Sequence, residues 1–240
     1  MRQAGAMTTA DGWAGTVRAR LGLGRILPLG TAADGAWLTE RAAQSVLHAA
    51  AAGEVRGAVV GRLRIGLADP GLAAEPVVPP PPGALPPGLL RIEAEFAAAP
   101  DEPIPVLAER LRAALHTAAV ERLDLAVTEI DLRVTALLDA APGPESGAGP
   151  DPDSGKSPAK VSAAPAQGEL GRAAAAAPGV AHLTDALGVP VRVADSSVRV
   201  ECATSRGHRP LAVALAVRKA VAPLLPEPVP VTVLITDVPA

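Results

Sequence analysis

The chain has 240 residues, of which 49% are hydrophobic and 20% are charged, and its formal net charge is −3. This composition is typical of a globular protein, and the small negative charge argues against a general attraction to nucleic acid or anionic lipid. One Phe, two Trp and no Tyr leave Ala, Val and Leu to build the core. Because Ala contributes little apolar area, we expect small units that pack against each other rather than one large core.

The single cysteine, Cys202, excludes an intrachain disulfide and any metal site built on Cys pairs, and it suits a reducing compartment. No apolar run reaches the ~20 residues that a bilayer crossing needs, and the first residues lack the apolar core of a signal peptide. We therefore expect a cytoplasmic protein without membrane insertion. The bias toward Ala, Gly, Pro and Arg is typical of a GC-rich genome, such as that of an actinobacterium.

Residues 1–33 are expected to form an N-terminal helical arm. Trp13, Val17 and Leu21 recur every four residues and would share one face of a short helix, which Pro28 and the neighbouring glycines end.

A first unit is expected over residues 34–139. It opens with a helix that begins after Thr39, a suitable N-cap, and stops at Gly53. The apolar stripe of this helix consists of Ala43, Val46, Leu47 and Ala50.

Alternating apolar and polar residues then predict three strands. These strands lie at residues 63–67, 92–96 and 130–134, and a helix from about Pro103 precedes the last of them. Residues 69–88 form a Pro-rich loop, because proline cannot donate to a strand ladder. A ligand for an SH3-like domain is the alternative interpretation of this loop.

Residues 140–168 are rich in Pro, Gly and Ser and are expected to be a disordered linker. A second, shortened unit covers residues 169–240. Its predicted elements are a helix at 169–177, strands at 189–193 and 198–202, a helix at 211–221 and a strand at 229–235. The order helix, strand, strand, helix, strand thus occurs twice, which indicates an internal duplication. The predicted fold class is α+β, with two related units that each carry a three-stranded sheet packed by helices.

Two short motifs suggest a nucleotide site but lack the context it needs. The SGKS sequence at residues 154–157 has no preceding strand and no correctly spaced glycine, so it does not form a phosphate loop. Gly22 and Gly24 lack the third glycine of a dinucleotide motif and are expected to be turn residues.

No residue type clusters at the spacing of a metal or catalytic site. The four histidines are scattered along the chain at His48, His116, His182 and His208. Cys202 shares a predicted strand face with Val198 and Val200, which favours a buried packing role. We therefore assign no catalytic, cofactor-binding or metal-binding residue. An enzyme of unrecognised type is the remaining alternative, and a reactive Cys202 would be its sign.

Two groups of charged residues are interpreted as solvent-facing. The acidic group alternates with apolar residues, as on the wet side of a strand, and consists of Glu93, Glu95, Glu129 and Asp131. The basic group consists of Arg199, Arg206, Arg209, Arg218 and Lys219. A nucleic-acid site is the alternative for the basic group, but stacking aromatic residues are missing.

Four stretches resemble the alkaline-shock, or Gls-type envelope-stress-response, family of small bacterial proteins. The stretch DGAWLTERAAQSVLHAAAAGEVRGAVV at residues 34–60 is similar to the opening of that family's unit, and RAAAAAPGVAHL at 172–183 is similar to the same helix end. VTVLITDV at 231–238, like EIDLRVTALLD at 129–139, is similar to its closing strand. The resemblance covers residues 34–139 and 169–238, although two units in one chain and the Pro-rich loop depart from the usual single-unit form.

The resemblance implies a non-enzymatic, protein-binding scaffold linked to cell-envelope stress homeostasis. It implies a cytoplasmic protein that a small membrane-anchored partner can hold at the inner face of the membrane, and it brings no cofactor or metal. We expect binding through exposed strand edges or helix faces, including self-association. Similar chains also carry the label of a nucleopolyhedrovirus fibrous-body protein, but the sustained apolar heptads of a fibre are missing.

A small α/β module that binds nucleic acid is the alternative function. It would need a Gly-x-x-Gly loop at a helix start or an aromatic platform, and the sequence has neither, so no nucleic-acid partner is expected.

Overall fold

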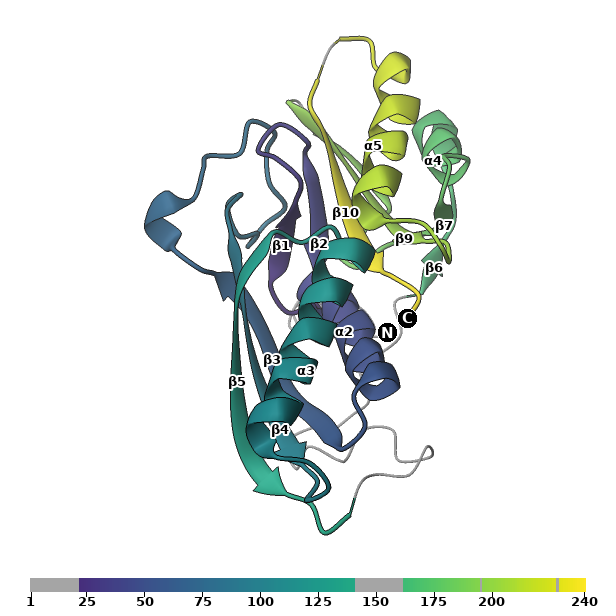
Figure 1. Cartoon of the computed structure of the whole chain (residues 1–240). Coiled ribbons are helices and arrows are strands. Elements are labelled where there is room, and N and C mark those ends of the chain that lie inside the picture. The colour runs from purple at the N-terminus through teal and green to yellow at the C-terminus, as the bar shows by residue number, and fades with distance from the viewer. Residues whose placement is uncertain (1–21, 141–161, 195, 228) are drawn as a thin grey trace, which may run out of the picture.

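The computed structural model describes residues 22–140, 162–194, 196–227 and 229–240. It confirms the α+β class, with one sheet of three strands and one of seven strands, both packed by helices (Figure 1). The helix expected around Trp13 and the SGKS motif lie outside the described residues, as does most of the expected linker.

The three-stranded sheet, called the first sheet below, contains the elements predicted for residues 34–139. These elements are α2 (Glu40–Glu54), β3 (Ala58–Leu67), β4 (Leu90–Ala98), α3 (Ile104–Thr117) and β5 (Val127–Leu137). The strand order is β3-β4-β5, with β3 antiparallel and β5 parallel to β4. Helices α2 and α3 lie on one face of this sheet (Figure 1), where Leu47, Ile65, Phe96 and Leu111 are buried.

The predicted start of α2 is confirmed, and its predicted end is wrong. The Thr39 hydroxyl accepts a hydrogen bond from the backbone N–H of Ala42 at 3.3 Å. Gly53 lies inside the helix, which continues to Glu54. The chain turns instead at Gly57, whose φ of 87° is one that residues with a side chain rarely adopt.

The second part of the chain repeats this topology, except that two short strands take the place of one strand. Its elements are α4 (Gly168–Ala175), β7 (Val180–Thr184), β8 (Val191–Ala194), β9 (Ser197–Thr204), α5 (Pro210–Val221) and β10 (Val231–Asp237). β7 and β8 pair antiparallel with successive halves of one edge of β9, and β10 pairs parallel with the other edge. β7 and β8 together therefore occupy the place that β3 has in the first sheet, and β7 was missing from the sequence prediction.

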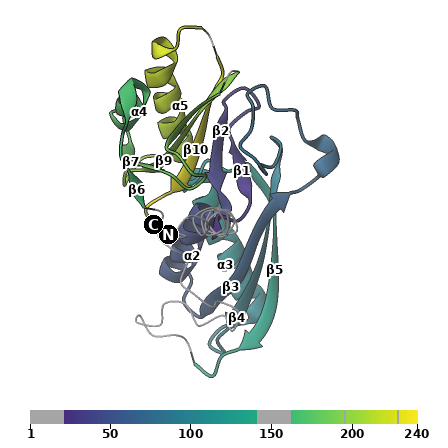
Figure 2. The ribbon, with the colours of Figure 1, turned by 180° about the vertical axis from the view of Figure 1, so that it is seen from behind.

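The sheet around β9, called the second sheet below, has seven strands rather than the expected three. β1 (Ile26–Leu29) and β2 (Ala36–Thr39) form a hairpin, and β2 pairs parallel with the outer edge of β10. β6 (Ala163–Ala164) pairs with β7. Figure 2 shows the hairpin beside β10. The last part of the expected helical arm and the end of the expected linker thus form strands.

The physical reasons for these differences are local. Pro28 is tolerated in β1 because this strand lies at the edge of the sheet, where a missing N–H leaves no ladder bond unmade. All four residues of β2 are buried, so β2 shows no alternation of polar and apolar residues. Such short, fully buried strands leave no periodic signal in the sequence.

The Pro-rich loop of the first unit packs against the second sheet. Apart from a short 3₁₀ turn (Pro70–Leu72), it has no helix or strand, as predicted. Val78 is buried against Trp37 and Leu234, and the Thr232 hydroxyl donates to the carbonyl of Pro79 at 2.7 Å. The loop therefore connects the two parts of the molecule.

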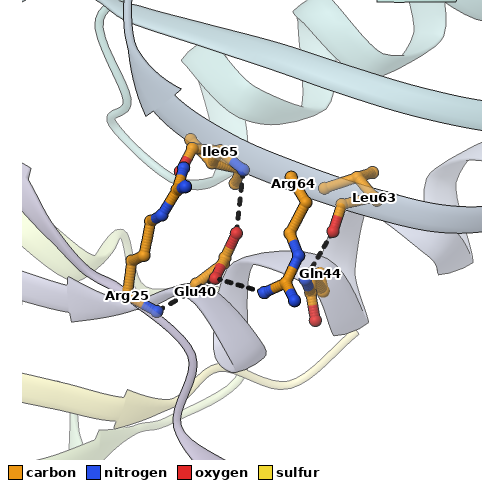
Figure 3. Close-up of polar contacts among 6 residues, drawn as sticks. All are labelled: Arg25, Glu40, Gln44, Leu63, Arg64 and Ile65. Atoms are coloured by element: carbon orange, nitrogen blue, oxygen red, sulfur yellow. Dashed lines mark hydrogen bonds and ion pairs between the residues drawn. The ribbon is translucent and has the colours of Figure 1, made fainter. Parts of the chain in front are cut away.

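A buried glutamate holds the junction between the two sheets (Figure 3). Glu40, the first residue of α2, is fully buried and accepts hydrogen bonds from the backbone N–H groups of Arg25 at 2.9 Å and Ile65 at 2.8 Å. The guanidinium of Arg64 lies 3.5 Å from the same carboxylate. Gly24 is a turn residue, as predicted, with a φ of 68°, and a Cβ there would lie 2.6 Å from a carboxylate oxygen of Glu40.

We expect Glu40→Ala to lower the free energy of unfolding by about 2–4 kcal/mol, because the buried N–H of Ile65 and the partly buried N–H of Arg25 lose their acceptor. Glu54→Ala is the matched control at the exposed end of the same helix and should change it by less than about 0.5 kcal/mol. Urea unfolding followed by circular dichroism measures both. Equal losses for the two variants would contradict the role given to Glu40.

Candidate functional site

The outer edge of β5 is the candidate functional site. β5 has 11 residues, more than any other described strand, and none of the described strands pairs with its outer edge. Ile130 and Leu132 are only half-buried, while Val134 is 37% and Leu137 is 72% exposed. An edge strand of this length with apolar side chains is a template for pairing with another strand.

Backbone groups of β5 face this open edge at every second residue. Nε of Arg112, on α3, donates to the carbonyl of Ile130 at 3.2 Å. The carbonyl of Ala126, just before β5, accepts from the N–H of Leu90 on β4 at 2.8 Å. A register shift between Leu90 and Arg91 separates that bond from the middle of β5. Because both backbone groups of a residue point to the same side of a strand, Leu132 and Val134 face the edge as Ile130 does.

The other edge of the first sheet is closed by side chains (Figure 3). Gln44 Nε2 donates to the carbonyl of Leu63 at 2.7 Å. Ile65 donates its N–H to Glu40 and accepts from Arg25 Nη1 at 2.9 Å. The carbonyl of Leu63 and both backbone groups of Ile65 on the outer edge of β3 are therefore already bound.

The edges of the second sheet are short or covered. On one side, β1 contains Pro28, and the N–H of Leu85 in the Pro-rich loop donates to the carbonyl of Ile26 at 2.8 Å. On the other side, β6 has only two residues, and β8 has four. Short strands, prolines and covering loops at a sheet edge are common ways in which proteins prevent unwanted strand pairing. β5, by contrast, is long and contains no proline.

The equivalent edge in the second sheet is occupied. β10 corresponds to β5, since each follows a helix and pairs parallel with the central strand. On its outer edge β10 carries β2, with Val233 opposite Ala36 and Ile235 opposite Leu38. The two halves of the molecule therefore differ in whether this edge carries a strand.

Charged side chains cover the face of the first sheet that is opposite the helices. A shallow pocket of about 370 Å³ lies on this face, and its charged lining residues are Arg62, Arg64, Glu93, Glu95, Asp131 and Arg133. Glu93, Glu129 and Asp131 are exposed, as predicted, and Glu95 is half-buried. Arg91 contacts Asp131 and lies 3.7 Å from both Glu93 and Glu129. Arg133 has no hydrogen bond or ion pair within the described part of the chain.

Cys202 is a packing residue, as predicted. It is fully buried beside Val200, in the core on the helix side of the second sheet. Burial, followed by the nearby charge of Glu201, raises the pKa of the thiol to about 12. The thiol therefore stays protonated at neutral pH and is a poor nucleophile.

The histidines remain apart in the structure. His48 lies on α2, His116 on α3, His182 on β7 and His208 before α5. Over the residues that the structure describes, no group of three or more His, Cys, Asp or Glu side chains is placed to hold a metal ion.

The predicted solvated basic group is corrected, because three of its members make structural contacts. Arg209 pairs with Asp124 of the first unit and donates to the carbonyl of Val120 at 3.0 Å. Arg218 donates to the carbonyl of Ala33 at 3.1 Å. The third, Arg199, is mostly buried. The arginines at 209 and 218 join the two parts of the chain, which the local sequence did not reveal.

Glu201 is a buried acid that the sequence analysis missed. It is fully buried, accepts from the N–H of Leu187 at 2.8 Å and lies 3.0 Å from Arg199. Burial raises its pKa to about 7, although Leu187 and Arg199 act in the opposite direction. The alternation of side chains along β9 places Glu201 on the face opposite Cys202. In the folded chain this face is covered as well.

Comparison with protein-family models, characterised proteins and solved structures gives no significant match. None of the helices in the described ranges combines the length and apolar character needed to cross a bilayer.

Glu201 predicts a specific pH dependence of stability. The folded state binds the proton of the Glu201 carboxyl more tightly than the unfolded state does. Protonated Glu201 therefore contributes to stability fully below about pH 4.5, and this stabilisation is lost as the pH rises toward 7. Relative to the parent chain, Glu201→Gln should therefore become more stable by about 2–3 kcal/mol between pH 4 and 8.

Urea midpoints at a series of pH values measure this difference. Glu75→Gln, at an exposed position in the Pro-rich loop, is the control and should follow the parent chain at every pH. A difference between Glu201→Gln and the parent that does not change with pH would contradict the assignment.

Proposed function

We propose that this chain is a non-enzymatic protein-binding scaffold that holds an extended protein segment by strand addition along β5. The observation that carries the proposal is the open outer edge of β5, in a molecule whose other described edges are short, bound by side chains or covered by a loop. In strand addition the backbone hydrogen bonds supply much of the affinity, and alternate side chains supply the specificity.

The second sheet supports this proposal, because β2 binds to the equivalent edge of β10 within the same chain. The duplicated fold therefore accepts an added strand at this position without changing its own strand order. An added strand on β5 would cover the apolar side of Ile130, Leu132 and Val134. Its other side would meet Asp131 and Arg133, so a strand that alternates apolar and charged residues fits best.

The cellular role is proposed from the sequence resemblance to alkaline-shock proteins. That resemblance supports a role in cell-envelope stress homeostasis, with a small membrane-anchored protein as the partner at the cytoplasmic face. A protein partner is favoured over nucleic acid because Arg209 and Arg218 are already bound to the chain itself.

Site-specific cross-linking in cells tests the proposal. A photoreactive residue at position 137, which is exposed on β5, should form protein adducts, and one at the exposed position 72 of the Pro-rich loop should not. Val134→Lys should reduce the yield of the β5 adducts about tenfold or more, because a charge at a strand edge opposes pairing.

Leu72→Lys is the matched control, since it adds the same charge to an exposed leucine far from β5 in the sequence, and it should leave the adducts unchanged. Equal adduct yields from positions 137 and 72, or β5 adducts that persist in Val134→Lys, would overturn the proposal. The mass of each adduct shows whether the bound protein is a second copy of this chain or a different protein.

A further inference from the structure

We infer that the strand bound by β5 is β5 of a second copy, paired antiparallel about a two-fold axis at Leu132. The inference rests on the proposed function, because it names the partner for the same edge. The basis of the inference is the order of charged and apolar residues along β5. In one antiparallel register, two copies of β5 place complementary residues opposite each other.

Charge complementarity selects this register. With Leu132 opposite its own copy, Asp131 lies opposite Arg133 of the second copy, and Arg133 lies opposite Asp131. Opposite charges at directly facing positions stabilise a strand pair, and like charges destabilise it. Arg133, which lacks a partner in the described part of the chain, gains one in this pairing, while Asp131 is already close to Arg91.

The neighbouring registers are unfavourable. A shift of two residues places either Asp131 or Arg133 opposite its own copy, which brings like charges together. A shift of one residue places charged side chains opposite apolar ones, because successive side chains of a strand lie on opposite faces.

The backbone of β5 also fits this pairing. Ile130, Leu132 and Val134 face the open edge, so Leu132 would pair with its own copy and Ile130 with Val134. Each such pair exchanges two N–H···O bonds in an antiparallel ladder. Arg112 would release the carbonyl of Ile130, which now accepts its hydrogen bond.

The pairing would also cover apolar surface. Ile130 and Leu132 are half-buried, and Val134 is 37% exposed, on the helix side of the strand. In the two-fold pair these side chains meet their counterparts on the same face, and the two first sheets become one continuous sheet. A two-fold contact of this kind is closed, so it gives a dimer rather than a fibre.

A charge-swap series on the purified full chain tests the inference. The parent chain should dimerise with rising concentration in sedimentation velocity. Asp131→Arg and Arg133→Asp should each raise the dissociation constant about tenfold or more, because both facing pairs become repulsive. The double variant Asp131→Arg with Arg133→Asp should dimerise again.

Mixing the two single variants gives a second readout. Asp131→Arg presents two arginines and Arg133→Asp presents two aspartates, so the 1:1 mixture should form a heterodimer more tightly than either variant forms a homodimer. Glu93→Arg, on the same charged face but on the central strand β4, is the control and should leave dimerisation unchanged. Circular dichroism verifies that each variant is folded.

Two results would overturn the inference. One is a parent chain that stays monomeric up to its solubility limit, and the other is a dimer that the two single reversals leave intact. Either result leaves the proposed function standing if β5 cross-links to a different protein in cells. The proposed function itself fails only if position 137 gives no β5-dependent adduct.

Discussion

The parallel pairing of β2 with β10 is the constraint on which the rest of the structure depends. β2 belongs to the second sheet, yet its last residue, Thr39, is the N-cap of α2, which covers the first sheet. The Thr39 hydroxyl accepts from Ala42 and donates to the carbonyl of Thr236 at 3.3 Å. Since one side chain bonds to both elements, the strand and the helix cannot shift independently. The two halves therefore share one continuous buried cluster.

Buried polar groups fix the geometry around this junction. Glu40 satisfies backbone groups of β3 and of the segment before β1, and the hydroxyls of Thr184 and Thr236 bond to each other at 2.8 Å between strands. A buried polar group is costly without its partner, so these contacts favour one arrangement over near alternatives. The core contains few aromatic side chains, whose shape would otherwise restrict how it packs. Hydrogen bonds between buried polar groups therefore contribute more to selecting one arrangement than they would in a core of larger side chains.

The duplication has different consequences in its two halves. In the second half, β10 is covered by β2, and the strand pairing is completed within the chain. In the first half, β5 occupies the same topological position and keeps its edge free among the described residues. The same surface thus serves the internal assembly in one half and, by our proposal, association with another protein in the other. Of the side chains that the structure describes, Arg112 alone bonds to the backbone of the open edge, and a single hydrogen bond is readily exchanged for a strand ladder.

The sequence by itself determined the α+β class, the repeated order of elements and the course of α2, α3, α5, β3, β4, β5 and β9, because periodicities of 3.6 and two residues are local properties. It also placed Cys202 in the core and Glu93 on the solvent side. Only the tertiary structure decided that β2 joins β10, that Glu40 and Glu201 are buried, and that β5 is the edge left open. These features depend on contacts between segments far apart in the sequence, and a short buried strand or a covered glutamate has the same local pattern as a loop or a solvated charge.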